Sequence, residues 1–319
     1  MTEHARVLVT GATGFIGSAL VSVLAQQGVV VTAATRQPAA NASPSVRNMA
    51  VGALSANTNW AHALAGQTTV VHCAARAHVM QETATDPTAL YREVNVLATL
   101  HLARQAVAAG VRRFIFISTI KVNGESTGPG QPFTACTKPG PQGAYAETKY
   151  EAELGLQALA AETGLELVII RPPLVYGAGV KGNFLALLKL VKTGVPLPFG
   201  RVNNRRSMVA LPNLLSLIGC CVDHPDASGQ VFLVKDGQDF STTELLRALA
   251  RALGQSLRLF PVPQKLLYLG ACMVGQRLRA KRFLECLQVD DSATRERLNW
   301  VPPLTAGEAL VLCFGVAEL

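Results

Sequence analysis

Tyr145 and Lys149, in the segment "AYAETKYEAE", are the residues whose types and spacing most directly indicate chemistry. A separation of four residues places both side chains on one face of a helix. A free tyrosine has a pKa of about 10, which makes it a poor base near neutral pH, and a nearby ammonium group favours its phenolate form. We therefore expect Tyr145 to act as a general acid–base group whose pKa is lowered by Lys149.

A pair of hydroxyl groups, Ser118 and Thr119, follows the apolar run "FIFI" and precedes Tyr145 by 26 to 27 residues. Open α/β sheets bind ligands beyond the carboxyl ends of their strands, so a hydroxyl group here is expected to hydrogen-bond the reacting oxygen. Lys121 follows this pair after one apolar residue, Ile120. Its side chain is expected to point either at an anionic or carbonyl-bearing substrate or into solvent, and the sequence leaves both possibilities open.

Three glycines in "VLVTGATGFIGSAL" form the pattern Gly11-x-x-Gly14-x-x-Gly17, directly after a predicted strand and at the start of a predicted helix. Glycines allow the backbone to approach a pyrophosphate closely, and the helix N-terminus offers free N–H groups. In this context the pattern predicts a dinucleotide site. The second predicted strand ends in Thr35-Arg36 without a carboxylate, and Arg36 is suited to a 2′-phosphate. The sequence therefore favours NADP(H) over NAD(H).

Short, β-branched runs alternate with helical stretches in the first half of the chain. Runs that are apolar on both faces are typical of buried parallel strands, and the alternation predicts an α/β sheet covered on both sides. Prolines cluster after residue 171, which predicts a dinucleotide-binding domain of 1–171 and a smaller lobe of 172–319, with some segments returning to the first domain. The predicted strands are 6–10, 29–34, 70–74, 112–118, 166–171, 230–234 and 257–260, and the predicted helices are 15–27, 87–109, 144–163, 241–253 and 264–280.

The 319 residues carry a formal net charge of +8, but no dense Lys/Arg run of the kind that binds nucleic acid. Phosphate-bearing small molecules are the expected partners. The seven cysteines have neither C-x-x-C nor zinc spacing, so we expect reduced thiols, a cytoplasmic protein and no metal site. Apolar stretches are too short to span a bilayer. For the apolar stretch 265–282, which has a basic end, packing on the core is expected in preference to membrane association.

Together these motifs resemble the extended short-chain dehydrogenase/reductase family of nucleotide-sugar epimerases, dehydratases and reductases. The strings "TGATGFIG", "VVHCAA", "YAETK" and "RPPLVYGAG" carry the resemblance, which covers nearly the whole chain. The resemblance implies a Rossmann-type, doubly wound parallel sheet with a smaller C-terminal substrate lobe. The family also implies a possible homodimer through the helices 87–109 and 144–163.

The resemblance implies positions for the ligands as well. It implies catalytic roles for Thr119, Tyr145 and Lys149, of which Lys149 also holds the nicotinamide ribose. The implied cofactor contacts are Gly11, Thr13, Gly14, Phe15, Ile16, Gly17, Arg36, Ala74, Ala75, Asn95, Ser118, Tyr145, Lys149 and Pro172. The implied contacts with a UDP-sugar are Ser118, Thr119, Lys121, Asn183, Arg206 and Arg282.

The residues after Thr119 separate the reactions that the family performs. Family 4,6-dehydratases carry an Asp-Glu pair there for the elimination of water, whereas this chain has Ile120-Lys121, which excludes a dehydratase. The strings "STIKVNGE" and "PPLVYGAGVKGNF" resemble the UDP-N-acetylquinovosamine dehydrogenases, a branch of which many members also carry the name UDP-glucose 4-epimerase. We expect NAD(P)H-dependent reduction of the 4-keto group of a UDP-4-keto-6-deoxy-hexosamine, feeding lipopolysaccharide biosynthesis of the O-antigen type. The alternative is a UDP-hexose or UDP-N-acetylhexosamine 4-epimerase with tightly bound NAD.

Overall fold

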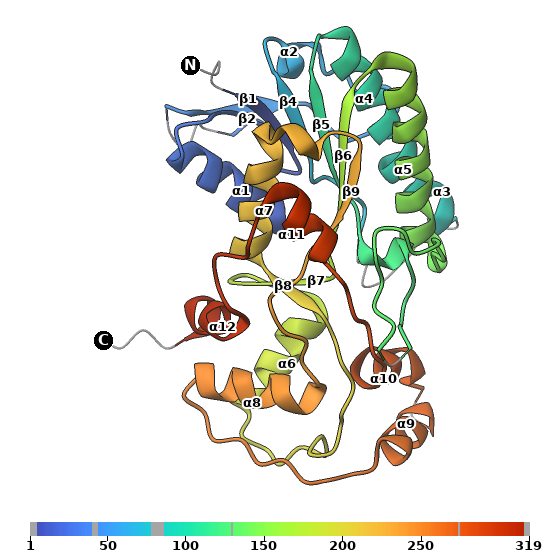
Figure 1. Cartoon of the computed structure of the whole chain (residues 1–319), viewed down its shortest axis with the longest axis vertical. Helices are drawn as coiled ribbons and strands as arrows, with labels where there is room; N and C mark the ends of the chain where they lie inside the picture. The colour runs from blue at the N-terminus through green and yellow to red at the C-terminus, as the bar shows by residue number, and fades with distance from the viewer. Residues whose placement is uncertain (1–4, 40–43, 78–85, 129, 274, 316–319) are drawn as a thin grey trace.

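A parallel sheet forms the centre of the computed structural model, which describes residues 5–39, 44–77, 86–128, 130–273 and 275–315. In this described part the sheet has seven strands in the order β3-β2-β1-β4-β5-β6-β9, and helices cover both of its faces (Figure 1). The chain runs outward from β1 in both directions, so the strand order reverses between β1 and β4. Ligands bind at such a reversal in doubly wound sheets. The predicted Rossmann-type α/β fold is confirmed.

The predicted strands and helices mostly agree with the structure to within a few residues. The edge strand β3 was not predicted, because Arg47 and Asn48 interrupt its apolar pattern. No strand forms over 257–260, where Leu259 makes only an isolated bridge to Leu197. The strands are β1 Arg6–Thr10, β2 Val30–Thr35, β3 Val46–Ala50, β4 Thr69–His72, β5 Arg113–Ile117, β6 Glu166–Arg171, β7 Leu174–Tyr176, β8 Met208–Ala210 and β9 Gln230–Leu233. The helices are α1 Phe15–Gln26, α2 Ala61–Leu64, α3 Pro87–Arg92, α4 Ala98–Ala108, α5 Gly143–Thr163, α6 Gly182–Lys192, α7 Leu211–Asp223, α8 Thr242–Ala252, α9 Gln264–Met273, α10 Arg277–Leu284, α11 Ser292–Leu298 and α12 Ala306–Phe314, with a π-helical segment Glu93–Leu97 and 3₁₀ turns Ile120–Val122 and Pro225–Ala227.

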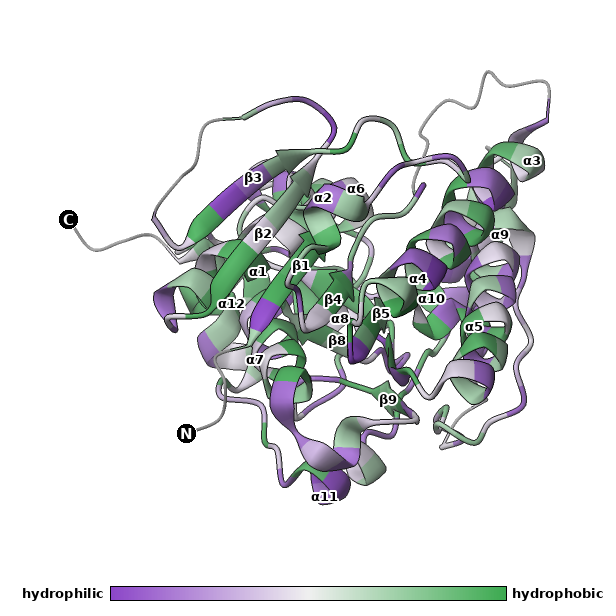
Figure 2. Cartoon of the chain, turned by 90° about the horizontal axis from the view of Figure 1, so that it is seen from above, coloured by the Kyte–Doolittle hydropathy of each residue, from purple (hydrophilic) through white to green (hydrophobic). Residues whose placement is uncertain are grey.

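Strand β5 shows why its sequence is apolar without alternation. Ile115 and Ile117 point into the core beneath α1 and α7, whereas Phe114 and Phe116 point into the core beneath α2, α4 and α5. Successive side chains of a strand face opposite sides of a sheet, and here both sides are covered. Figure 2 shows mostly hydrophobic colours along the central strands β1, β4 and β5, while β3 at the edge has a larger hydrophilic part.

The chain passes repeatedly between the sheet and the smaller lobe. After β6 it forms β7 and α6 in the smaller lobe, and α7 then returns to pack against α1. Strand β9 joins the sheet beside β6, and α8 follows in the smaller lobe with α6 and α12 (Figure 1). The smaller lobe therefore has its own hydrophobic core, although it is built from separate segments of the chain.

The predicted helix 264–280 is two helices, α9 and α10, separated at Gly275, where φ is +71°. Helix α9 has no buried residue. Its Leu267, Tyr268 and Ala271 pack, partly buried, on a small cluster that includes Ala280 and Leu284 of α10. The expectation that this stretch packs on the core is confirmed for α10 and for one face of α9, although α9 has no fully buried residue.

A buried carboxylate, Asp236, joins the sheet to the smaller lobe. It follows β9 and accepts hydrogen bonds from the Tyr176 hydroxyl (2.6 Å), the Asn213 amide (2.7 Å) and the backbone N–H of Ala210 (3.0 Å). Asn213 also donates to the carbonyl of Leu304 (2.9 Å). One side chain thus satisfies donors from β7 and from both ends of the β8–α7 junction.

Replacement of Asp236 by alanine should lower the free energy of unfolding by about 3 kcal/mol, because it leaves several buried donors without an acceptor. Urea unfolding of the parent and the variant measures this loss. Asp226→Ala is the matched control, since Asp226 is exposed and its loss should change stability by less than about 0.5 kcal/mol. Similar small losses in both variants would contradict the role assigned to Asp236.

Candidate active site

The glycine turn between β1 and α1 is shaped for a close approach of the backbone. Gly11 has a φ of +66°, and a Cβ atom there would lie 2.8 Å from the backbone nitrogen of Ala74. A Cβ atom on Gly17 would lie 2.2 Å from the carbonyl oxygen of Gly11. Gly14 is the N-cap of α1 and has no side chain to occupy the free N–H groups of the helix. These groups, together with the positive end of the helix dipole, fit the pyrophosphate of a dinucleotide.

Residues at the end of β4 support this turn. His72 lies between Thr10 (2.7 Å) and Thr99 (2.9 Å), and burial together with the charge of Lys149 lowers its pKa to about 3. His72 is therefore a neutral packing residue. Asn95 binds the backbone of Arg76 through both ends of its amide and donates to the Thr148 hydroxyl (3.1 Å).

This hydrogen bonding ties the loop after β4 to α5. The expected cofactor contacts of Asn95, the buried Ala74 and the exposed Ala75 stay predictions. Thr13 is exposed in the glycine turn, and Phe15 and Ile16 form the start of α1. Pro172 is buried, and its carbonyl accepts a hydrogen bond from the backbone N–H of Ile120 (3.0 Å).

Thr119 and Tyr145 meet at the carboxyl end of β5. Thr119 is buried, and its side chain is hydrogen-bonded to the Tyr145 hydroxyl. Desolvation raises the pKa of Tyr145 to about 12; the hydrogen bond from Thr119 lowers it, and the neighbouring Tyr91 raises it further. The expectation that Lys149 lowers this pKa is not met, because burial is the dominant effect. Tyr145 is held in its protonated form.

Lys149 lies in the protein interior beneath Tyr145, one helical turn further along α5. It is 1% exposed, and its ammonium nitrogen lies 3.7 Å from the centroid of the Phe116 ring. Burial lowers the pKa of Lys149 to about 7, while Glu153 and Cys73 act in the opposite direction. The ring face and the Glu153 carboxylate therefore stabilise the charged form against the cost of burial.

A buried ion pair behind Tyr145 and Lys149 was not predicted from the sequence. Glu153 accepts hydrogen bonds from the Ser118 hydroxyl and from Nε of Arg171 (3.0 Å). Arg171 also donates to Oδ1 of Asn123 (3.1 Å). Glu153 follows Lys149 by four residues, so a carboxylate on the buried face of α5 was visible in the sequence. Ser118 is thus held by Glu153.

Three of the residues that are expected to bind substrate, Lys121, Arg206 and Arg282, are linked through charged neighbours. Lys121 forms an ion pair with Glu125 (2.7 Å), and Arg206 donates to the carbonyl of Glu285 (3.0 Å). Burial and the nearby Arg282 lower the pKa of Arg206, whereas Cys286, Glu125 and Glu285 favour its charge. Arg206 therefore lies close enough to Arg282 and to Glu125 to interact with their charges, and Glu125 is the ion-pair partner of Lys121.

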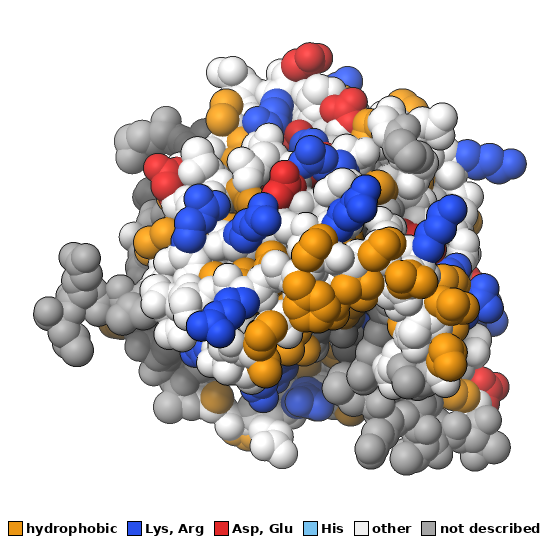
Figure 3. All heavy atoms as spheres, turned by 90° about the horizontal axis from the view of Figure 1, so that it is seen from below, with side chains coloured by type: hydrophobic (Ala, Val, Ile, Leu, Met, Phe, Trp, Pro, Cys, Tyr) orange, Lys and Arg blue, Asp and Glu red, His pale blue; other side chains and the backbone are white. Residues whose placement is uncertain are grey.

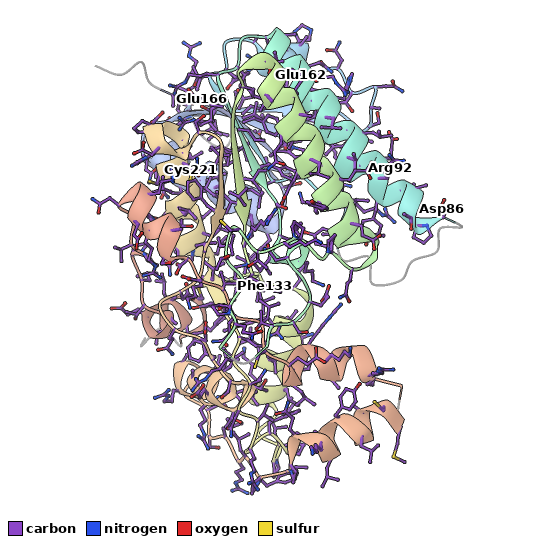
Figure 4. The ribbon with its side chains drawn as sticks, turned by 45° about the vertical axis from the view of Figure 1, so that its right-hand side comes forward. Asp86, Arg92, Phe133, Glu162, Glu166 and Cys221 are labelled. Atoms are coloured by element: carbon purple, nitrogen blue, oxygen red, sulfur yellow. The ribbon has the colours of Figure 1, made fainter. Side chains whose placement is uncertain are left out.

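Two more residues, Asn183 and Phe133, belong to the smaller lobe or contact it. Asn183 lies in the first turn of α6, and its side chain is outside the part of the chain that the structure describes. Phe133 packs with Ile120 and Val289 and lies in the middle of the molecule, between the end of the sheet and the helices α9 and α10 (Figure 4). The segment after Thr119 thus contacts the smaller lobe directly.

Metal sites and membrane spans are both absent from the part of the chain that the structure describes. Within these residues, no three His, Cys, Asp or Glu side chains are grouped so that they could hold a metal ion. Over the same ranges, no helix is long and apolar enough to cross a membrane.

Lys149→Met should remove a pH dependence of stability. The pKa of about 7 in the folded protein lies below the ordinary value of 10.5, so the unfolded chain binds more protons between these values. The contribution of Lys149 to stability therefore rises with pH through this window and is lost as pH falls towards 7. Urea unfolding at about pH 7 and about pH 9 measures this effect. The free energy of unfolding of the parent, relative to that of the variant, should increase by about 1 kcal/mol per pH unit.

The exposed Lys138 provides the matched control for this measurement. For Lys138→Met the difference from the parent should stay constant to within about 0.5 kcal/mol over the same pH range. A flat difference for Lys149→Met as well would show that its pKa is not lowered in the folded protein.

Residues 7–234 match the sequence pattern of the NAD dependent epimerase/dehydratase family. A UDP-glucose 4-epimerase of Vibrio cholerae is 46% identical over 303 residues, which cover 95% of this chain and 92% of that protein. A UDP-glucuronic acid 4-epimerase from Bacillus cereus, solved in complex with NAD, has a TM-score of 0.77 at 19% identity and covers 97% of both chains. A UDP-glucose 4-epimerase from Thermotoga maritima, solved with UDP-glucose, has a TM-score of 0.75 at 22% identity and also covers 97% of both chains.

The two solved structures establish the similarity of the fold. The family match spans more than two thirds of the chain, and the relative from Vibrio cholerae extends it over nearly all of the remainder. The chain therefore belongs to the NAD-dependent epimerase/dehydratase family of short-chain dehydrogenases/reductases.

Proposed function

We propose that this chain reduces the 4-keto group of a UDP-4-keto-6-deoxy-hexosamine with NAD(P)H. The observation that carries the proposal is the hydrogen bond between Thr119 and Tyr145, next to Lys149, with Tyr145 held protonated. Reduction of a carbonyl requires a proton donor beside the reacting oxygen, and a protonated tyrosine is such a donor. A UDP-sugar substrate is supported by the names of the Vibrio cholerae relative and of the similar solved structures.

In the proposed reaction, a nicotinamide cofactor held by the glycine turn would supply the hydride for C4 of the keto sugar. Tyr145 donates its phenolic proton to the C4 oxygen as negative charge develops on it. Thr119 hydrogen-bonds the same oxygen, and its contact with Tyr145 orients the phenol group. Lys149, charged with the help of Glu153, stabilises the phenolate that remains and holds the nicotinamide ribose. Arg206 and Arg282 bind the diphosphate.

A UDP-hexose or UDP-N-acetylhexosamine 4-epimerase is the second candidate, favoured by the name of the 46% identical relative. An epimerase begins by oxidising the sugar, so its tyrosine must first accept a proton. The raised pKa of Tyr145 keeps the phenol protonated at neutral pH but also makes it a weaker acid, so this shift does not separate the two reactions. We place the reductase first because the strings "STIKVNGE" and "PPLVYGAGVKGNF" resemble that branch of the family.

The setting of the reaction belongs to the same proposal. We place it in the cytoplasm, with a product that feeds O-antigen-type polysaccharide synthesis, on the strength of the family resemblance. A homodimer through α4 and α5 would cover Leu97 and Leu154, which are large apolar side chains exposed on these helices or next to them.

The proposed reaction predicts consumption of NADPH when the purified protein is mixed with a UDP-4-keto-6-deoxy-hexosamine, with formation of the 4-hydroxy sugar. Tyr145→Phe should keep cofactor binding and lower turnover by at least about 100-fold, because the proton donor is lost. Tyr150→Phe, on the same helix, is the matched control and should retain turnover. Absorbance at the NADPH band and mass analysis of the sugar measure both outcomes.

Interconversion of UDP-galactose and UDP-glucose without added cofactor, by protein that is purified already saturated with NAD, would instead establish the epimerase. Substantial keto-sugar reduction by Tyr145→Phe would contradict the role of Tyr145 in either reaction.

We also propose a preference for NADP(H), because the exposed Arg36 follows β2 at the edge of the glycine turn, where a 2′-phosphate is read. Arg36→Asp should lower kcat/KM for NADPH by at least about tenfold while leaving NADH turnover unchanged or higher. Arg47→Asp, an equally charged change at an exposed site on β3, is the control and should leave the ratio unaltered. Equal use of NADPH and NADH by the parent and by Arg36→Asp would exclude this preference. The similar Bacillus cereus structure was solved in complex with NAD, so the parent should be assayed with both cofactors.

A further inference from the structure

Helix α9 exposes an apolar face at the end of the smaller lobe. Leu266, Leu269 and Met273 follow one another at helical spacing and are 58%, 58% and 83% exposed. Phe260, in the segment leading into α9, is 46% exposed. We call these four residues the α9 face. Viewed from below, hydrophobic side chains gather into one cluster at this end of the molecule (Figure 3).

The surroundings of the α9 face are strongly basic. Residues 245–284 contain eight Lys and Arg and no Asp or Glu. When those eight are set aside, the 21 Lys and Arg that remain equal the 21 Asp and Glu of the chain, so this segment accounts for the whole net charge of +8. Arg258, Lys265 and Arg277 are exposed immediately around the α9 face. Figure 3 shows Lys and Arg side chains along the border of the hydrophobic cluster.

We propose that the α9 face docks on the surface of an anionic lipid bilayer. A helix with leucine and methionine on one face and Lys or Arg beside them lies in a membrane interface, where the apolar side chains enter the acyl region and the cations meet lipid phosphates. Residues 245–284 contain no carboxylate, although Glu285, directly after them, forms an ion pair with Lys281 (3.9 Å). The exposed cations beside the α9 face, Arg258, Lys265 and Arg277, are the groups that would meet an anionic surface. The docking needs no helix that crosses the bilayer.

Other occupants match these observations less well. A second copy of the chain would bring the exposed Arg258, Lys265 and Arg277 of both copies together around the α9 face. Nucleic acid would satisfy the cations but would gain little from burying Leu266, Leu269 and Met273. The α9 face is outside the candidate active site, although α10, which packs on α9, carries Arg282. The docking is therefore independent of which reaction the protein performs.

Flotation of the full-length protein with vesicles tests the proposal. With vesicles of about 70% phosphatidylcholine and 30% phosphatidylglycerol, the bound fraction should exceed that with pure phosphatidylcholine by at least about tenfold. It should fall when NaCl is raised from about 0.1 M to about 0.5 M. Leu266→Glu/Leu269→Glu should lower the bound fraction on the anionic vesicles by at least about tenfold.

Val301→Glu/Leu312→Glu is the matched control, because it adds the same two charges at apolar residues that are 70% and 68% exposed elsewhere. It should bind as the parent does, and both variants should keep the parent's melting temperature. Lys265→Gln/Arg277→Gln is a second variant and should weaken binding and flatten its salt dependence. Absence of parent flotation, equal binding to neutral vesicles, or parent-like binding by the Leu266/Leu269 variant would overturn the proposal. An equal loss in the control variant would show a net-charge effect only and would overturn it too.

Discussion

The buried ion pair between Glu153 and Arg171 is the interaction on which the candidate active site depends. The pair joins α5, which carries Tyr145 and Lys149, to the end of β6. Taking these two charges out of water is costly, and removal of one partner would leave the other uncompensated at a cost of about 3–5 kcal/mol. The remaining hydrogen-bonding capacity of the pair is used by Ser118 and Asn123, which lie on either side of Thr119. The position of the Thr119 hydroxyl group is therefore set by groups that lie behind it in the core.

This arrangement also explains how two groups with opposite requirements share one helix. Tyr145 lies where desolvation favours its neutral form, whereas Lys149, one turn away, lies over an aromatic ring and next to a carboxylate. Burial acts against the charge on both groups. The Glu153 carboxylate offsets part of the cost of burial for the Lys149 ammonium group but not for a Tyr145 phenolate. The protonation states of Tyr145 and Lys149 therefore depend on a third residue, Glu153.

The local patterns of the sequence predicted the fold well, because the parallel strands have continuous apolar runs and three glycines at this spacing between a strand and a helix are specific to a tight turn. The same patterns placed Thr119, Tyr145 and Lys149 correctly at one end of the sheet. The direction of the Tyr145 pKa was missed, since desolvation depends on how tightly the neighbours of a group pack and not on its spacing from a lysine. The exposure of α9 was missed for a related reason: an apolar helix has the same sequence whether or not another surface covers it.

The repeated passage of the chain between sheet and smaller lobe has a consequence for recombination between relatives. The smaller lobe consists of the segment from β7 to β8, the segment from α8 to α10 and the final helix α12, with α7, β9 and α11 lying against the sheet in between. A chimera that exchanged everything after residue 171 would also exchange β9, the edge strand of the sheet next to β6, together with the covering helices α7 and α11. Transfer of substrate specificity from one relative to another therefore calls for several short grafts with many junctions, and a single crossover point would divide the core beneath α1 and α7.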